Sequence, residues 1–293
     1  MIRTLINRIP APILFIISGL TQYSGAALAV ILFTVMTPTT VAWWRVSIAA
    51  VILLLWRRPW TIPISRRDIA WSALFGIFMT GMNIVFYEAV SRIDLGVAVS
   101  LEFLGPVLVA VTTNRTFSAR LAAGFAFIGV ALISGLGLDT SQPRIGQGIL
   151  LAILAGLLWG AYMVLGQRIA SRRSGLTSLA IGSTAGAIVF SPLAFHDAGL
   201  AFATIPIIVT VIGVSVLSTV LPYSIDQIAF ARLDASTFAL LNSLLPATSL
   251  IIGAIALHQL PSIPSVIGLI LISIAVWLAS FRTKPRPSRA AQA

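Results

Sequence analysis

The feature that most constrains this chain is a series of long apolar segments separated by short polar gaps. A helix needs about 20 mainly apolar residues to cross the ~30 Å hydrocarbon core of a bilayer. On that basis the sequence predicts ten membrane spans, at 12–33, 38–56, 68–90, 95–113, 117–137, 146–168, 175–195, 203–229, 234–257 and 263–281. Hydrophobic residues make up 58% of the chain and charged residues 9%, whereas soluble domains have roughly 25% charged residues. We therefore expect an all-α polytopic membrane protein with the lipid bilayer as its solvent.

The basic residues alternate between the two sides of the predicted spans. Arginine and lysine are concentrated in the N-terminal segment, in the gaps after even-numbered spans and in the tail, whereas the other gaps contain only Arg92 and Arg144. Cytoplasmic loops carry the excess of positive charge, so both termini are predicted to be cytoplasmic. The net charge of +11 is spread over these loops and forms no basic face, so nucleic acid is not an expected partner.

The sequence around the third gap recurs once, near the eighth gap. Arg-Ile-Asp at 92–94 corresponds to Arg-Leu-Asp at 232–234, and Pro106 corresponds to Pro246 at the same spacing. The chain then divides into 1–143 and 144–281, followed by a basic tail, 282–293, that we expect to be disordered. Five spans in each half turn the second half upside down relative to the first. The sequence therefore predicts ten transmembrane helices as two inverted five-helix repeats, as in secondary transporters with a midplane site.

A carboxylate inside the fourth predicted span is the strongest candidate for a functional group. Glu102 lies about eight residues past the gap, which is roughly 12 Å deep at ~1.5 Å rise per residue. A charged side chain at that depth is costly and needs a reason. It could take a substrate ammonium group or a coupling proton, or hydrogen-bond between helices as a structural group. Its counterpart in the second half is Asn242, which is expected to meet it near the midplane.

Four other charged residues lie in or near the spans. Arg45 could bind a substrate carboxylate, pair with Glu102 or Glu88, or extend to the lipid headgroups. Glu88 and Arg92 have i,i+4 spacing, which favours a local ion pair, although Glu88 is also a candidate for ion coupling. Asp226 could be an interfacial residue, an inner gate or a proton site.

Helix breakers and polar side chains occur in the same spans. Gly105-Pro106, Pro222 and Pro246 free backbone carbonyls inside the membrane, where such groups are re-satisfied or line a cavity. Simple packing kinks are the alternative. The polar residues expected to line one central cavity are Gln22, Tyr23, Asn83, Tyr87, Tyr223 and Gln227. Of these, Tyr23, Asn83, Tyr87 and Tyr223 are expected to contact substrate.

Signatures of enzymes are absent from the sequence. It contains no phosphate-binding loop, no His-Glu-x-x-His pair, no metal-ligand cluster and no cysteine. We expect no catalytic residue, no metal site and no cofactor, so any energy coupling would use an ion gradient, with protons as the candidate ion. A secondary active transporter of a small molecule is the favoured function. A membrane enzyme or a non-transporting membrane scaffold is the alternative from a different class.

Two stretches resemble a known transporter family. The elements Leu-Glu-Phe-Leu-Gly-Pro at 101–106 and Ser-Thr-Val-Leu-Pro-Tyr-Ser at 218–224 are similar to the drug/metabolite transporter superfamily of the EamA-domain type. They are most similar to its bacterial threonine/homoserine exporter group. The resemblance implies proton-coupled export of small neutral amino acids or related metabolites across the bacterial inner membrane. It also implies that Glu102 and Arg45 are the family's carboxylate and arginine. From the inverted repeat we expect alternating access, in which the halves rock around a midplane site at Glu102 and Asn242.

The sequence departs from that family's pattern at three places. The group usually has a glutamate immediately before the second-half proline, where this chain has Leu245, and Gly-Glu at the end of the ninth span, where it has His258-Gln259. Glu88 stands where an apolar residue is common. An exporter of drugs or organic cations is therefore kept as an alternative. The substrate, the direction of transport, the coupling ion and the oligomeric state stay open at this point.

Overall fold

The computed structural model describes residues 11–113, 117–132, 142–170, 175–230 and 245–280, and its regular structure there is helical throughout. The α-helices are α2 (Ala11–Leu32), α3 (Pro38–Arg57), α4 (Arg66–Val90), α5 (Leu95–Glu102), α6 (Leu104–Thr113), α7 (Phe117–Ala131), α8 (Pro143–Ala170), α9 (Gly175–Ala194), α10 (Ile205–Ser215), α11 (Leu221–Phe230), α13 (Leu245–Ala256) and α14 (Ile263–Ser280). Two short 3-10 helices, η1 (Pro59–Thr61) and η3 (Ala198–Phe202), and a π-helical turn, η4 (Val216–Val220), complete the set. Asn242, the turn at 232–234 and the tail 282–293 lie outside the described residues. The predicted all-α class is confirmed.

The described helices fall within or close to the predicted spans. Within the described ranges, six helical stretches are long and apolar enough to cross a membrane. Four shorter apolar stretches accompany them, at Leu95–Val109, Arg120–Ala131, Leu245–Ala256 and Ile263–Leu278. Length and composition therefore support a multi-pass membrane protein.

Local sequence signals set where several helices begin. Thr37 is the N-cap of α3, and its side chain accepts a hydrogen bond from the Thr40 N–H, with Pro38 in the first turn. Ser65 caps α4 in the same way by accepting from the Asp68 N–H at 3.1 Å. Asp68 then lies in the first turn, where a carboxylate suits the helix dipole.

The fourth and eighth predicted spans are each interrupted near a proline. α5 ends at Glu102 and α6 begins at Leu104, immediately before Gly105-Pro106. α10 gives way to η4, and α11 follows with Pro222 as its second residue. Proline has no N–H to donate to the carbonyl four residues before it. Each interruption therefore leaves one backbone carbonyl that needs another partner.

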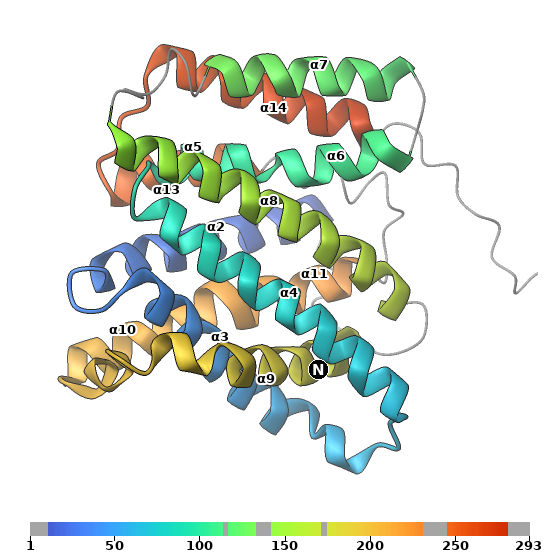
Figure 1. The fold of residues 1–293 in the computed structure, drawn as a ribbon, viewed down its shortest axis with the longest axis vertical. Helices are drawn as coiled ribbons and strands as arrows, with labels where there is room; N and C mark the ends of the chain where they lie inside the picture. Colours follow the sequence, from blue (N-terminus) through green and yellow to red (C-terminus); the bar gives the residue numbers. More distant parts are fainter. Residues whose placement is uncertain (1–10, 114–116, 133–141, 171–174, 231–244, 281–293) are drawn as a thin grey trace, which may run out of the picture.

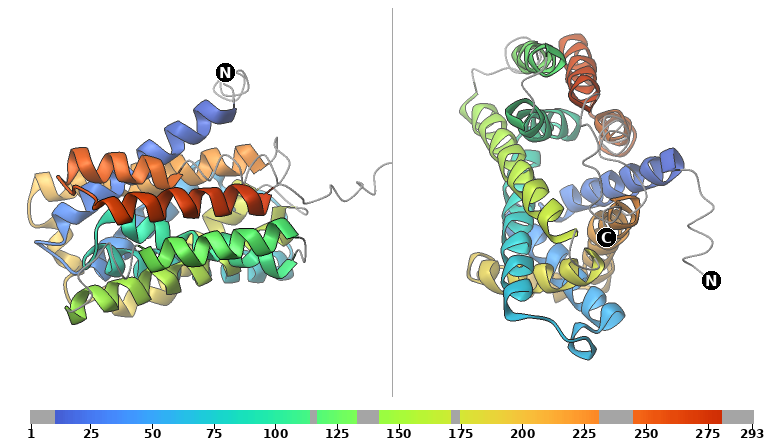
Figure 2. Two further views of the ribbon diagram at one scale, coloured as in Figure 1. Left: turned by 90° about the horizontal axis from the view of Figure 1, so that it is seen from above. Right: turned by 90° about the vertical axis from the view of Figure 1, so that its right-hand side faces the viewer.

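Helices of the first half of the chain pack mainly against helices of the second half (Figure 1). α4 lies against α8 and α9, α3 lies against α9, and α7 runs beside α14 at one end of the molecule. α2 packs against α11 and α13. Seen from above, most of the helices run roughly along one direction (Figure 2), as expected of a bundle that crosses a bilayer.

Glycines make the closest helix contacts possible. A Cβ on Gly76 of α4 would collide with the backbone of Gly182 in α9, and a Cβ on Gly105 of α6 would collide with the backbone of Gly156 in α8. Such small-residue contacts are typical of membrane helices, where backbones approach closely in the absence of a hydrophobic driving force. They bring α8 directly against the interruption between α5 and α6.

The outward faces of the bundle carry large apolar side chains. Phe127 and Ile205 are each 76% exposed, and Leu150 is 69% exposed. Exposed apolar area on this scale would be a liability in water but suits contact with lipid. The interior has a different character, because fully or nearly fully buried Tyr23 and Tyr87 lie there among apolar neighbours.

Candidate functional site

A buried arginine is the centre of the candidate site. Arg45 lies on α3 and is only 2% exposed. Its Nε donates to the Thr219 hydroxyl at 2.7 Å, and its Nη2 donates to the Ser218 carbonyl at 2.6 Å. Its guanidinium carbon lies 5.1 Å from the centroid of the Tyr87 ring, a cation–π arrangement. The side chain therefore does not extend to the headgroups, which was one of the interpretations open from the sequence.

The acceptor for Arg45 comes from the helix interruption before Pro222. In a regular α-helix the Ser218 carbonyl would accept from residue 222, which is proline and has no N–H. The chain instead forms the π-helical turn η4 at this point, a feature frequent at functional sites. The Ser218 carbonyl is thereby available to Arg45. The second half of the chain thus supplies the partners of an arginine from the first half.

Tyr87 of α4 has an unsatisfied hydroxyl. The side chain is fully buried, and its hydroxyl has no hydrogen-bond partner among the described residues. The ring packs edge-on against Phe33 at 5.8 Å between centroids and lies 6.2 Å from the Phe86 ring. A buried polar group without a partner lowers stability by about 1–3 kcal/mol and calls for an explanation. A polar ligand beside Arg45 would supply the missing partner.

Glu102 lies at the interruption between α5 and α6 and is 7% exposed. Its carboxylate makes no ion pair or hydrogen bond with another residue that the structure describes, but it interacts electrostatically with the Arg45 charge. Its backbone carbonyl, whose α-helical donor would be Pro106, lies against Gly156, where any Cβ would collide with it. A direct Arg45–Glu102 ion pair, which the sequence left open, is therefore not formed. The two side chains therefore interact electrostatically without forming an ion pair or a hydrogen bond with each other.

A group of aromatic and polar residues extends from this centre. Asn83 donates to the Met79 carbonyl at 2.8 Å and to the Tyr223 hydroxyl at 3.4 Å. The Tyr223 ring lies 6.3 Å from that of Tyr162 between centroids. Tyr23 is buried and interacts electrostatically with residues of α3, α5 and α11, namely Arg45, Glu102, Tyr223 and Asp226.

Asp226 is the second carboxylate of this interior region. Its Oδ1 accepts a hydrogen bond from the Ser18 hydroxyl of α2 at 3.3 Å. Seven of the residues selected from the sequence therefore belong to one interior region, which we call the central cluster: Tyr23, Arg45, Asn83, Tyr87, Glu102, Tyr223 and Asp226. Pro246 is also buried, on α13, whereas Asn242 lies outside the described residues.

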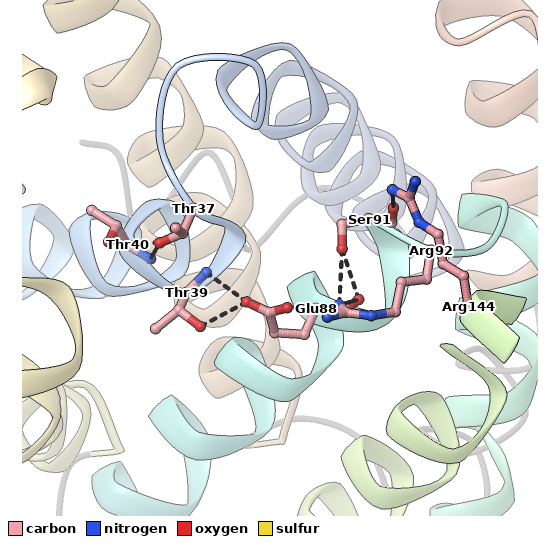
Figure 3. A network of polar contacts seen from close by, with 7 residues as sticks. All are labelled: Thr37, Thr39, Thr40, Glu88, Ser91, Arg92 and Arg144. Atoms are coloured by element: carbon pink, nitrogen blue, oxygen red, sulfur yellow. Dashed lines mark hydrogen bonds and ion pairs between the residues drawn. The ribbon is translucent and has the colours of Figure 1, made fainter. Parts of the chain in front are cut away.

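Glu88 belongs to a different set of contacts, which we call the outer network. Figure 3 shows seven of its residues, Thr37, Thr39, Thr40, Glu88, Ser91, Arg92 and Arg144, and Asp197 is the eighth. The Glu88 carboxylate pairs with Arg92 at 2.6 Å and accepts from the Thr39 hydroxyl at 2.8 Å and the Thr39 N–H at 3.2 Å. Arg144 of α8 donates to the Ser91 carbonyl at 2.7 Å. The i,i+4 ion pair predicted from the sequence is confirmed.

Asp197, which the sequence reasoning did not select, ties the loop after α9 to the start of α3. Its Oδ2 accepts from the Thr37 N–H at 2.5 Å, and its Oδ1 accepts from the Thr40 hydroxyl. Burial raises the pKa of this carboxyl, but the hydrogen bonds from Thr37 and Thr40 outweigh it, so that the pKa lies below its ordinary value. The carboxylate is therefore held in its charged form.

Gln259 makes a similar contact between the halves. Its Oε1 accepts from the Leu95 N–H at 3.0 Å and so caps α5, whose N-cap residue Asp94 makes no side-chain cap bond. Asp94 and Gln259 line a pocket between α5, α13 and α14, and burial raises the pKa of Asp94. An amide at position 259 accepts this bond as a carboxylate would.

Sequence reasoning did not select several polar and aromatic partners of the central cluster. Thr219 and Ser218 were noticed only as part of a family element, and Ser18 and Tyr162 were not selected. An isolated hydroxyl in an apolar span was the only signal for each of them. Such a signal is common to many structural serines and threonines and does not single out a site.

Comparison with known proteins identifies the family. Residues 146–281 match the EamA-like transporter family. The threonine/homoserine exporter RhtA of Salmonella typhimurium strain LT2 is 34% identical over 249 residues, which cover 85% of this chain and 84% of the exporter. The chain belongs to the EamA-like transporter family. RhtA of Escherichia coli K12 is also 34% identical, over 235 residues that cover 80% of this chain and 79% of the exporter.

Two more distant proteins are similar to this chain over most of its length. An uncharacterized transporter of Archaeoglobus fulgidus is 23% identical over 279 residues, 91% of each chain. A solved crystal structure that is 16% identical shares the fold, with a TM-score of 0.62 over 92% of this chain and 96% of that one. This EamA-like transporter therefore belongs with transporters and not with enzymes, and its helices are those of a multi-pass membrane protein.

Proposed function

We propose that this protein is a secondary active transporter that exports small neutral amino acids, such as threonine and homoserine, or related metabolites. The observation that carries the proposal is the central cluster, in which a buried cation, a buried carboxylate and an unsatisfied hydroxyl lie together. The membrane in question is the bacterial inner membrane, with both termini cytoplasmic as the distribution of basic residues predicts.

A zwitterion complements the charges of the central cluster. Its carboxylate would lie on the free edge of Arg45, because Nε and one Nη2 hydrogen are taken by Thr219 and Ser218 while Nη1 makes no hydrogen bond within the described residues. Its ammonium group would lie at Glu102. The Tyr87 hydroxyl would then donate to the substrate. The related RhtA exporters at 34% identity support this class of substrate.

The packing supports ten transmembrane helices arranged as two inverted repeats, 1–143 and 144–281. Two pairs of helices that are equivalent under the predicted repeat lie against each other: α3 against α9, and α7 against α14. A pseudo-two-fold axis between the halves would produce these pairs. The family match begins at residue 146, close to the predicted start of the second repeat.

Alternating access would require the outer ends of the helices to separate. On the predicted topology the outer network and the Gln259–Leu95 contact lie on the outer side, where they join the two halves. Their hydrogen bonds close that side. Proton coupling, if it drives export, then fits Glu102 and Asp226 better than Glu88, because the Glu88 carboxylate is held by Arg92 and Thr39.

Flux through purified protein in liposomes tests this function. Vesicles with and without the protein would be loaded with radiolabelled threonine, with an imposed pH gradient, and homoserine, other amino acids and a cationic dye would compete. We expect protein-dependent threonine flux that homoserine inhibits and a pH gradient accelerates. Dye flux without amino-acid flux would instead favour an exporter of organic cations. Absence of any flux would favour a scaffold or a membrane enzyme.

A further inference from the structure

We propose that Thr219 is a positioning residue for Arg45, and that the π-helical turn η4 makes the transporter selective for substrates with a carboxylate. The inference rests on the proposed function, because it concerns how that site recognises one end of its substrate. It gives a role to the Ser-Thr-Val-Leu-Pro-Tyr-Ser element at 218–224, which is otherwise only a mark of the family.

Arginine binds a carboxylate best when its planar group is already oriented. A guanidinium presents its N–H groups as a fixed fork that matches two carboxylate oxygens, but the side chain has several rotatable bonds to order. Ordering them in advance reduces the loss of freedom on binding. The structure therefore needs a device that holds the Arg45 fork in one orientation.

Two kinds of contact provide that orientation. The Tyr87 ring lies against the guanidinium at 5.1 Å and restricts its distance from α4. The bonds to Thr219 Oγ1 and the Ser218 carbonyl fix the rotation of the group, since they engage Nε and Nη2 at 2.7 and 2.6 Å. Thr219 and Ser218 are fully buried, so water does not compete for these bonds. Only the edge with Nη1 remains to meet a ligand.

A third bond anchors the backbone at the same point. The Ser215 hydroxyl donates to the Arg45 carbonyl at 2.8 Å. The Arg45 main chain is therefore bonded to Ser215, the residue just before η4, and the Arg45 side chain is bonded to η4 itself. The bond to the Arg45 carbonyl fixes the position of α3, whereas the bond from Nε to Thr219 fixes the orientation of the guanidinium group. Of the two side-chain partners, only Thr219 can be altered without changing the main chain.

Substitution of Thr219 and comparison of two substrates test the inference. Thr219→Val keeps the shape and removes the hydroxyl, Thr219→Ser keeps the hydroxyl, and Thr210→Val is a matched control on exposed α10 surface. Each variant would be assayed in liposomes for KM and kcat with threonine and with threoninol, in which an alcohol replaces the carboxylate. Thermal unfolding in detergent would show that each variant is folded.

We expect Thr219→Val to raise KM for threonine about tenfold, since a hydrogen bond to a charged group is worth roughly that factor or more. The KM or inhibition constant of threoninol should change by less than about twofold. Thr219→Ser and Thr210→Val should resemble the wild type. Equal changes for both substrates, or Thr219→Ser as impaired as Thr219→Val, would overturn the inference, as would an unchanged threonine KM. These results require a wild type that transports threonine; a wild type that transports no amino acid overturns the proposed function and this inference together.

Discussion

The central cluster and the outer network both contain carboxylates, but they satisfy them differently. In the outer network Glu88 and Asp197 each accept hydrogen bonds from two or more donors. In the central cluster, the Glu102 carboxylate makes no such bond with another described residue, and Tyr87 has an unpaired hydroxyl there. Structural polar networks are usually complete, whereas binding sites leave groups for the ligand. The difference supports the proposal that the outer network closes one side of the protein and that Glu102 is available to a substrate.

Loss of the Arg45 charge should have the largest effect on transport. Arg45→Gln removes the donors to a substrate carboxylate and to Ser218 and Thr219. Two charge-assisted hydrogen bonds correspond to about a hundredfold in affinity. We therefore expect threonine export to fall about a hundredfold, as measured by initial efflux rates in liposomes. An export rate within about threefold of the wild-type rate would show that Arg45 does not bind the substrate.

Tyr87→Phe should separate function from stability. The substitution removes a hydroxyl that lacks a partner, so thermal stability should stay the same or rise slightly. Threonine KM should nevertheless rise by about fivefold, the size expected for one neutral hydrogen bond to the ligand. Calorimetric or fluorescence unfolding and efflux kinetics would be measured on the same preparation. A less stable variant with unchanged KM would assign the hydroxyl a structural role.

A break in the outer network should open the outer side with a smaller effect on substrate affinity. The chain contains no cysteine, so Val97→Cys, in the pocket beside Asp94, gives a single reporter of outer access. Arg144→Ala removes the hydrogen bond to the Ser91 carbonyl, which joins the two halves. It should raise the rate of maleimide labelling by about threefold, the effect of a ~0.6 kcal/mol shift in a two-state equilibrium. Threonine KM should change by less than twofold. Unchanged labelling would mean that these contacts do not close the outer side.

The smallest expected effect is that of the Asp197 charge on thermal stability, which should depend on pH. Its pKa lies below the ordinary value of 3.8, because hydrogen bonds from Thr37 and Thr40 outweigh the effect of burial. A lowered pKa contributes stability above the ordinary value, and that contribution is lost as the pH falls through the native pKa. Asp197→Asn should therefore lower the unfolding temperature slightly at neutral pH. The difference in unfolding temperature between the wild type and this variant should disappear below about pH 4. A difference in unfolding temperature that is constant with pH would show that the Asp197 charge does not contribute to stability.

The sequence predicts those structural features that are determined by residues close together in the chain. Helices α3 and α4 follow apolar segments and cap residues, and the Glu88–Arg92 pair follows from i,i+4 spacing, so these features could be predicted from the sequence. The interruptions near Pro106 and Pro222 were likewise signalled by the residues themselves.

The partners across the two halves could not be read in the same way. From the sequence, Arg45 could bind a substrate carboxylate, pair with Glu102 or Glu88, or extend to the lipid headgroups. It is bonded instead to Ser218 and Thr219, because Pro222 frees a carbonyl that only the packing of η4 against α3 brings within reach. Asp197 depends in the same way on where the loop after α9 lies. These contacts follow from tertiary arrangement and not from spacing along the chain.

The central claim is that the substrate binds to the central cluster and not to the outer network. The most direct test compares Glu102→Gln with Glu88→Gln in threonine efflux from liposomes, with and without a pH gradient. We predict that Glu102→Gln abolishes gradient-dependent efflux, whereas Glu88→Gln retains most of it and remains responsive to the gradient. Undiminished, still proton-coupled efflux by Glu102→Gln would contradict the account.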